Sequence, residues 1–191
     1  MKPILSIWIK PLKTFDYLAQ RENEKNNINI NIIFFLVSMT AGFSSANDIH
    51  RLFEGNYYIS LLFGLILSGL FGLLFLNTLF TYSIWGISKL FQGKADKNQI
   101  RLVIAYSLIP NLIHLIIGLI LIVPALITNN VELITYKNPI TVFVLWIFTL
   151  RILLFGLAFF NKYSYGYALL TIVIPAAIFQ GILYWIKFAN G

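Results

Sequence analysis

The side chain that stands out most in this sequence is an arginine within an apolar stretch. Arg151 lies nine residues before Phe160, inside the run from Ile140 to Phe160. At about 1.5 Å per residue, this is roughly 13–14 Å from the end of a helix. An ionised side chain at that depth in hydrocarbon costs about 2.5–3.5 kcal/mol or more. Arg151 should therefore have polar partners or reach water.

Amides and hydroxyls at a similar depth are the candidate partners. Asn77 and Asn111 each lie ten or eleven residues inside a neighbouring apolar stretch. Ser107, Asn111 and His114 follow helical spacing, which places them on one face of a helix. Amide oxygens accept hydrogen bonds from a guanidinium. We predict a polar cluster of Arg151, Asn77, Asn111 and Ser107, with His114 on the same stripe.

Two interpretations of this cluster stay open at this point. Its hydrogen bonds could hold the helices together, at about 0.6 kcal/mol each on average. Alternatively, an arginine with no carboxylate partner could attract an anionic lipid headgroup or an anionic solute.

Residue types that support catalysis or metal binding are sparse. All seven acidic residues fall in the N-terminal segment or in expected loops, and there is no cysteine. The two histidines, His50 and His114, belong to different segments. Neither an H-E-x-x-H nor a G-x-S-x-G motif occurs. We therefore expect no enzymatic activity, no cofactor and no bound metal.

The composition indicates that lipid is the solvent of this chain. Of its 191 residues, 59% are hydrophobic and 11% are charged, whereas soluble domains carry about 25% charged residues. A hydrocarbon core of about 30 Å needs roughly 17–25 residues of helix. The predicted fold is an all-α transmembrane bundle of about five helices, namely Ile28–Ala46, Tyr57–Ser88, Arg101–Ile127, Ile140–Phe160 and Tyr163–Ile186.

Basic residues are distributed unequally between the two sides of these spans. Ten of the 14 lysines and arginines lie on the side of the N-terminus, three lie on the other side, and Arg151 lies within a span. This asymmetry predicts a cytoplasmic N-terminus and an outside C-terminus. Because topology accounts for the basic charge, we expect no nucleic-acid partner.

The N-terminal segment, residues 1–27, is predicted to be a cytoplasmic leader ahead of a membrane domain of residues 28–191. Pro11 suits the first turn of a helix. The apolar residues after it follow helical spacing on one face, namely Leu12, Phe15, Leu18 and Ala19. This pattern predicts a short amphipathic helix on the membrane surface. The alternative is a disordered leader whose lysines reach the headgroups.

Small residues in the second stretch predict a close contact between helices. Gly64, Ser68 and Gly72 recur every four residues, which lets another helix approach closely. The contact could be internal, or it could be the face of a homo-oligomer.

Three short motifs occur in order along the chain. The first contains Pro11 and Phe15 in P-L-K-T-F, and the second contains Tyr106, Ser107 and Pro110 in A-Y-S-L-I-P. The third contains Tyr165 and Gly166 in Y-G-Y-A. With these motifs and five expected helices, the chain resembles the Yip family of membrane proteins, from Pro11 to the last helix.

The resemblance implies a five-helix bundle with a cytoplasmic N-terminus. Eukaryotic members of the family act in vesicle traffic and associate with Rab GTPases. This chain lacks their D-L-Y-G-P element and its leader is short, so it is more similar to the prokaryotic branch. That similarity implies the cytoplasmic (inner) membrane of a bacterium.

The function predicted from these features is a non-enzymatic adaptor or organiser of the membrane. Its partners would be membrane lipids or a protein at the cytoplasmic face. The alternative is a small transporter or channel for an anion or a lipid, which would use the polar cluster around Arg151. Five helices rarely enclose a pore alone, so this alternative predicts a stable oligomer.

Overall fold

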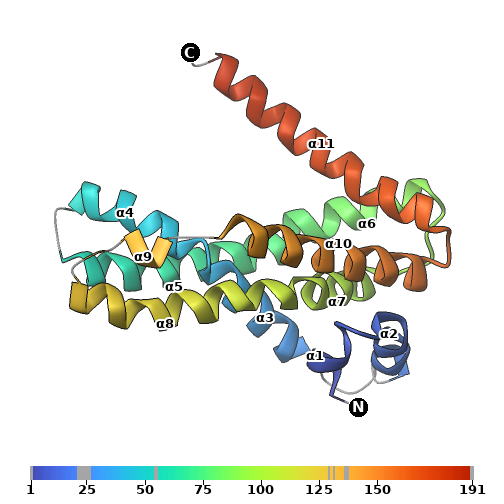
Figure 1. The fold of residues 1–191 in the computed structure, drawn as a ribbon. Coiled ribbons are helices and arrows are strands. Elements are labelled where there is room, and N and C mark those ends of the chain that lie inside the picture. Colours follow the sequence, from blue (N-terminus) through green and yellow to red (C-terminus); the bar gives the residue numbers. More distant parts are fainter. Residues whose placement is uncertain are drawn as a thin grey trace.

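The computed structural model describes residues 2–20, 27–53, 56–128, 130, 132–135 and 138–189. Its regular elements are all helical (Figure 1). In chain order they are α1 (Pro3–Ser6), α2 (Pro11–Gln20), α3 (Asn27–Met39), α4 (Gly42–Phe53), α5 (Tyr57–Phe75), η1 (Leu76–Phe80), α6 (Thr81–Leu90), α7 (Lys97–Leu108), η2 (Ile109–Asn111), α8 (Leu112–Thr128), α9 (Glu132–Thr135), α10 (Pro139–Asn161) and α11 (Tyr165–Ala189). Arg21, Lys25 and Lys137, which enter the charge count, lie outside the described residues.

The described helices form a bundle whose length and apolar composition suit a membrane. Four of them are long and apolar enough to cross it, and a fifth span is counted if the bent pair α3–α4 is one. The elements α5, η1 and α6 run on as one helix from Tyr57 to Leu90. Likewise α7, η2 and α8 run from Lys97 to Thr128. The prediction of an all-α membrane bundle is confirmed.

The first predicted span, Ile28–Ala46, is not one straight helix. The chain bends by 51° between α3 and α4, and α4 continues to Phe53. At the bend the Thr40 hydroxyl donates to the Val37 carbonyl at 2.7 Å, which closes α3. Gly42 then lies against the backbone of α5, where an added Cβ would be 2.5 Å from the Leu65 Cα. The bend therefore lets α4 pack closely on α5.

The small-residue stripe of α5 is used inside the molecule. An added Cβ on Gly64 would lie 3.3 Å from the Ser45 hydroxyl of α4, and one on Gly72 would meet the Ser38 side chain of α3. Ser68 lies 3.4 Å from Ser45, oxygen to oxygen. The stripe thus forms the internal contact that its spacing allowed.

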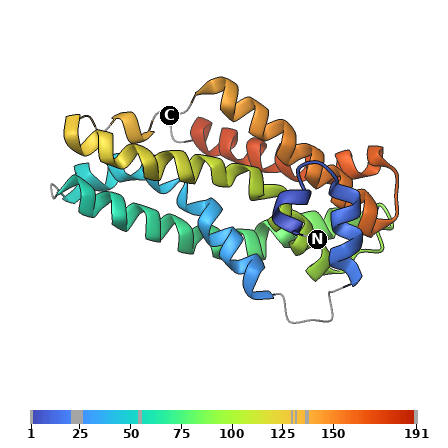
Figure 2. The ribbon, with the colours of Figure 1, turned by 60° about the horizontal axis from the view of Figure 1, so that its bottom comes forward.

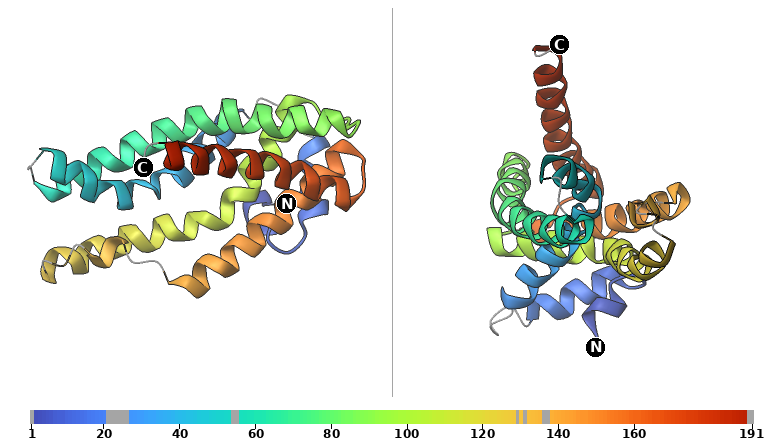
Figure 3. Two further views of the ribbon diagram at one scale, coloured as in Figure 1. Left: turned by 90° about the horizontal axis from the view of Figure 1, so that it is seen from above. Right: turned by 90° about the vertical axis from the view of Figure 1, so that its left-hand side faces the viewer.

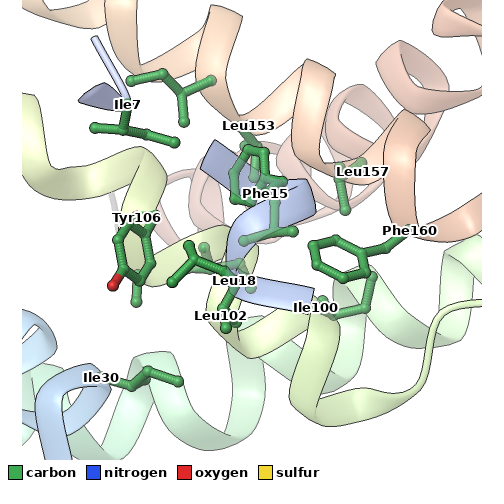
Figure 4. Packing of buried hydrophobic residues seen from close by; sticks show 14 of the residues in the cluster. Ile7, Phe15, Leu18, Ile30, Ile100, Leu102, Tyr106, Leu153, Leu157 and Phe160 are labelled. Carbon is green, nitrogen blue, oxygen red and sulfur yellow. The ribbon is translucent and has the colours of Figure 1, made fainter. Parts of the chain in front are cut away.

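Two apolar cores lie at opposite ends of the bundle. The larger is at what we call the leader end, which carries residues 91–96 between α6 and α7 and residues 162–164 between α10 and α11. The smaller is at the far end, where α5 begins and α8 ends. It includes Phe43, Leu61, Leu65 and Leu115. Side chains of the leader, α7 and α10 meet in the larger core (Figure 4).

The amphipathic helix begins at Pro11 as predicted, but its buried side chains pack on protein. Figure 2 shows α1 and α2 against the leader end of the bundle, and α2 contacts α10. Phe15 and Leu18 are buried, whereas Leu12 of the predicted apolar face is exposed. The leader therefore contributes to the bundle core, and its contact with the membrane surface stays a prediction.

The last helix leaves the bundle. Toward the C-terminus α11 diverges from the other helices (Figures 1 and 3). It packs on α10 and α6. Only 12% of its apolar window is buried, so lipid would cover most of this helix in a membrane.

Candidate functional site

The P-L-K-T-F segment docks the leader onto the bundle. Thr14 is fully buried, and its hydroxyl donates to the Lys10 carbonyl at 2.9 Å. The Thr14 hydroxyl also lies 2.9 Å from that of Ser6. These bonds fix the turn between α1 and α2, and the turn directs the next residue, Phe15, toward α10.

Phe15 fills a space that α10 leaves open at a glycine. Its ring is fully buried and packs edge-on against Phe160, with ring centroids 5.9 Å apart. A methyl group on Gly156 would lie 2.8 Å from the Phe15 ring and 2.6 Å from Val103. Only glycine leaves room for the ring here. Figure 4 shows Phe15 between Leu153, Leu157 and Phe160 of α10.

Asn161, the last residue of α10, joins the two connections of the leader end. Its side chain is buried, its Oδ1 accepts from the Ala95 amide at 3.2 Å, and its Nδ2 donates to the Leu157 carbonyl at 3.1 Å. Its backbone carbonyl accepts from the Lys94 amide at 3.2 Å. We call these contacts between residues 93–95 and Asn161 the Asn161 junction.

The loop that reaches the junction is fixed by its own contacts. The Lys89 ammonium donates to the carbonyls of Gly93 and Ala95, at 2.9 and 2.8 Å. An added Cβ on Gly93 would lie 2.8 Å from the Ser88 carbonyl and would collide with the Asn161 amide. The buried polar atoms of the junction are thus paired, as stable burial of polar groups requires.

Tyr163 extends the junction to α11. Its hydroxyl accepts from Asn161 Nδ2 at 3.3 Å and lies 2.9 Å from the Thr171 hydroxyl. Since Thr171 donates its proton to the Tyr167 carbonyl at 2.8 Å, Tyr163 is the donor to Thr171. Burial raises the pKa of Tyr163, against a smaller lowering by its two hydrogen bonds. The phenol therefore keeps its proton at neutral pH, as this arrangement requires.

A pocket of about 540 Å³ opens beside the junction. Its walls come from α2, from the loop before α7 and the start of that helix, and from the end of α10. They are formed by Ala19, Lys94, Gln99, Phe159, Phe160 and Lys162. Lys94 and Lys162 are both exposed. The pocket therefore combines two cations with aromatic walls, and it is our candidate functional site.

Comparison with models of protein families identifies the family of this chain. The model described as the Yip1 domain matches residues 5–186. The chain belongs to the Yip1 domain family. No curated protein and no solved structure gave a significant match.

Residues of the three motifs occupy different places in this Yip1 domain. Pro11 and Phe15 belong to the docked leader. Tyr106, Ser107 and Pro110 are buried in α7 and η2, and the Ser107 hydroxyl donates to the Ile104 carbonyl at 2.7 Å. Tyr165 and Gly166 open α11 and are exposed. The Tyr165 ring lies 5.4 Å from that of Phe155 on α10.

Arg151 does have a polar partner, and that partner is the leader. Its Nη1 donates to the Trp8 carbonyl at 3.1 Å, and its guanidinium lies 5.5 Å from the centre of the Phe155 ring. The Trp8 ring in turn lies 5.4 Å from that of Phe148. Arg151 is exposed on α10 and helps to hold the leader in place.

The other members of the predicted cluster contact different elements. Asn111 donates to the Thr149 hydroxyl at 3.4 Å. His114 lies partly buried on α8. Asn77 hydrogen-bonds to Arg101 of α7 and to Asn31 of α3. The structure therefore does not gather Arg151, Asn77 and Asn111 into one site.

Arg101, Asn31 and Asn77 instead form a closed triangle of hydrogen bonds. Arg101 donates to the side-chain oxygens of both asparagines, and the Asn77 amide donates to Asn31 at 3.0 Å. Asn77 lies in η1, a π-helical segment inside the long helix. Arg101 was expected only as the edge of a span, and no spacing in the sequence links it to residues 24 and 70 positions away.

Proposed function

We propose that this Yip1-domain protein is a non-enzymatic adaptor or organiser of the membrane, acting through protein or lipid partners at its leader end. The observation that supports this most is the pocket beside the Asn161 junction. It combines exposed cations with aromatic walls, and the docked leader forms one of its sides. Such a hollow suits recognition of an acidic or amphiphilic partner.

We also propose a membrane orientation in which the leader end faces the cytoplasm. The excess of lysine and arginine on this side supports it, and so does the placement of Lys94, Lys97 and Lys162 around the connections of that end. The bent pair α3–α4 would then be the first of five spans. The similarity of the sequence to prokaryotic members supports the inner membrane of a bacterium.

We do not propose transport. The path for an anion or a lipid was to be lined by Arg151, Asn111 and Asn77, and these side chains have separate partners. Arg151 is exposed and bonds to the leader. No observation on the described residues favours a route between the helices.

Photo-crosslinking in cells tests the adaptor proposal. A benzophenone amino acid would replace Asn98, which is exposed at the leader end, and Arg51, which is exposed at the far end, would be the matched control position. We expect discrete protein or lipid adducts from position 98 that position 51 does not give. Equal adducts from both positions, together with solute flux in proteoliposomes, would overturn the proposal in favour of transport.

The same pair of positions tests the orientation. Because the chain contains no cysteine, a single cysteine at position 98 or 51 can be labelled without background. A membrane-impermeant maleimide should label intact cells at position 51 only. Labelling at position 98 alone would invert the proposed orientation.

A further inference from the structure

We propose that the pocket of Lys94 and Lys162 binds a phosphate group carried by an amphiphile, with both lysines as its cationic ligands. This inference rests on the proposed function, since it names the chemistry that the leader end would recognise. It goes beyond that proposal by assigning a ligand class and two ligand residues.

The charge of the two lysines favours an anionic ligand. Among the described residues, no carboxylate forms an ion pair with Lys94 or Lys162. The nearest acid in sequence, Asp96, accepts the Gln99 amide at 2.8 Å as the N-cap of α7. Asp16 of α2 accepts a hydrogen bond from Gln20 at 3.2 Å. Two lysines with no ion-paired acid in the described part of the chain attract anions, and ammonium groups are common phosphate ligands in proteins.

The backbone of both lysines is held in place. The Lys94 amide donates to the Asn161 carbonyl, and the Lys162 amide donates to the Ala158 carbonyl at 3.0 Å. Lys162 has a φ of 56°, the left-handed conformation that ends α10. Because the junction fixes these positions before any ligand arrives, binding has to order only the two side chains.

The size of the pocket and its level in the bundle favour a lipid phosphate. Its volume of about 540 Å³ lies within the range of roughly 300–1,000 Å³ found for small-molecule sites, and it exceeds what a bare phosphate needs. Phe159, Phe160 and Ala19 give it apolar walls. It lies where the apolar spans end, at Lys97 and Asn161. In a membrane this is the level of the headgroups, so a phosphate with an attached glycerol and acyl chains fits best.

The test uses the full chain in dodecyl maltoside. Each probe is titrated into the protein, and its affinity is obtained from the change in a signal of the protein. The probes are dioctanoyl phosphatidic acid, inorganic phosphate and dioctanoyl phosphatidylcholine. The test variant is K94Q/K162Q. The control variant, K10Q/K13Q, removes the same charge from two exposed lysines of the leader that do not line the pocket.

We expect phosphatidic acid to bind the wild type more tightly than phosphatidylcholine. K94Q/K162Q should weaken that binding by about 25-fold, or about fivefold for each lysine. K10Q/K13Q should weaken it less than twofold. Inorganic phosphate that binds as tightly as the lipid, with the same dependence on Lys94 and Lys162, would overturn the amphiphile as the ligand and leave a site for a soluble phosphate compound.

A third variant tests the space of the pocket while keeping the charge of its lysines. Ala19→Trp keeps both lysines and fills the space between them and α2, so it should weaken phosphatidic acid more than inorganic phosphate. Unchanged thermal unfolding of each variant shows that the fold is intact. Equal losses in K94Q/K162Q and K10Q/K13Q, or no binding of either phosphate probe, would overturn the inference. The adaptor proposal is tested separately, because crosslinks from position 98 would persist even if the phosphate site were absent.

Discussion

The two ends of this bundle are built in different ways. At the leader end, the buried polar side chain of the Asn161 junction is paired, and three segments far apart in the sequence share one core. At the far end the core is smaller and apolar, and the second half of α11 stands apart from the other helices. The comparison teaches that specific hydrogen bonds define the geometry of the leader end, whereas the far end depends on close packing of small residues and on lipid.

The surroundings of Arg101 and Arg151 give a second contrast. Arg101 is held by two amides inside the bundle, whereas Arg151 is exposed and bonds to one backbone carbonyl of the leader. An internal arginine is expected to support the packing of helices, and an exposed one to support docking of a peripheral segment. Substitution of Arg101 should therefore lower the stability of the bundle more, whereas substitution of Arg151 should mainly release the leader.

The largest effect is expected from Phe15→Ala. Removing a buried Phe ring costs about 3–5 kcal/mol, and here the loss should release the leader without unfolding the far end. Trypsin cleavage after Lys13 should therefore speed up about 100-fold or more. Leu12→Ala, on the exposed side of α2, is the control and should change the rate by less than threefold. Equal rates in the two variants would show that Phe15 does not dock the leader.

A smaller loss is expected from Asn161→Leu, which keeps the volume and removes the polar groups of the junction. The Ala95 amide would then be buried without an acceptor, which costs about 1–3 kcal/mol. Thermal unfolding in detergent measures this loss. The control is Asn98→Leu, an exposed change on α7 that should alter stability by less than about 0.5 kcal/mol. A junction variant as stable as its control would remove the contrast between the two ends.

The two arginines give the next comparison. Arg101→Leu leaves the bond between Asn77 and Asn31 but removes two charged hydrogen bonds, so it should cost about 1–2 kcal/mol of bundle stability. Arg151→Leu removes one exposed bond and should cost about 0.5 kcal/mol, together with faster trypsin cleavage of the leader. The reverse order of the two losses would mean that Arg151, and not Arg101, supports the bundle.

The smallest effect is expected from Gly86→Ala. No atom of the described residues lies within 4 Å of an added Cβ there, so alanine should leave stability unchanged or raise it by up to about 1 kcal/mol. Gly156→Ala, in which the new methyl would meet Phe15 and Val103, should cost about 1–3 kcal/mol instead. The melting temperatures of the pair measure how tightly the leader end is packed.

Much of the fold could be predicted because it depends on local pattern. The long apolar runs predicted the helices from Tyr57 to Leu90 and from Lys97 to Thr128 to within a few residues. Pro11 marked the start of α2. The spacing of Gly64, Ser68 and Gly72 indicated a close contact of α5. Each of these features is encoded within one continuous stretch of the chain.

The candidate site could be predicted only in part. The charge count placed Lys94 and Lys162 on the side of the N-terminus, and partners were expected at that face. Nothing in the sequence brought Lys94 and Lys162 into one pocket, because the hydrogen bonds of Asn161 join them across 68 positions of the chain.

The sequence by itself determined that lipid is the solvent, that helices span it, and that their basic connections lie mainly on one side. It could do so because hydropathy and charge act on each residue separately. The tertiary structure decided which polar groups meet. The bend before Gly42 and the π-helical segment at Asn77 change the offset and rotation of whole helices. A small change of this kind places Asn77 beside Arg101 and leaves Arg151 to the leader, where it helps to hold one wall of the candidate pocket in place.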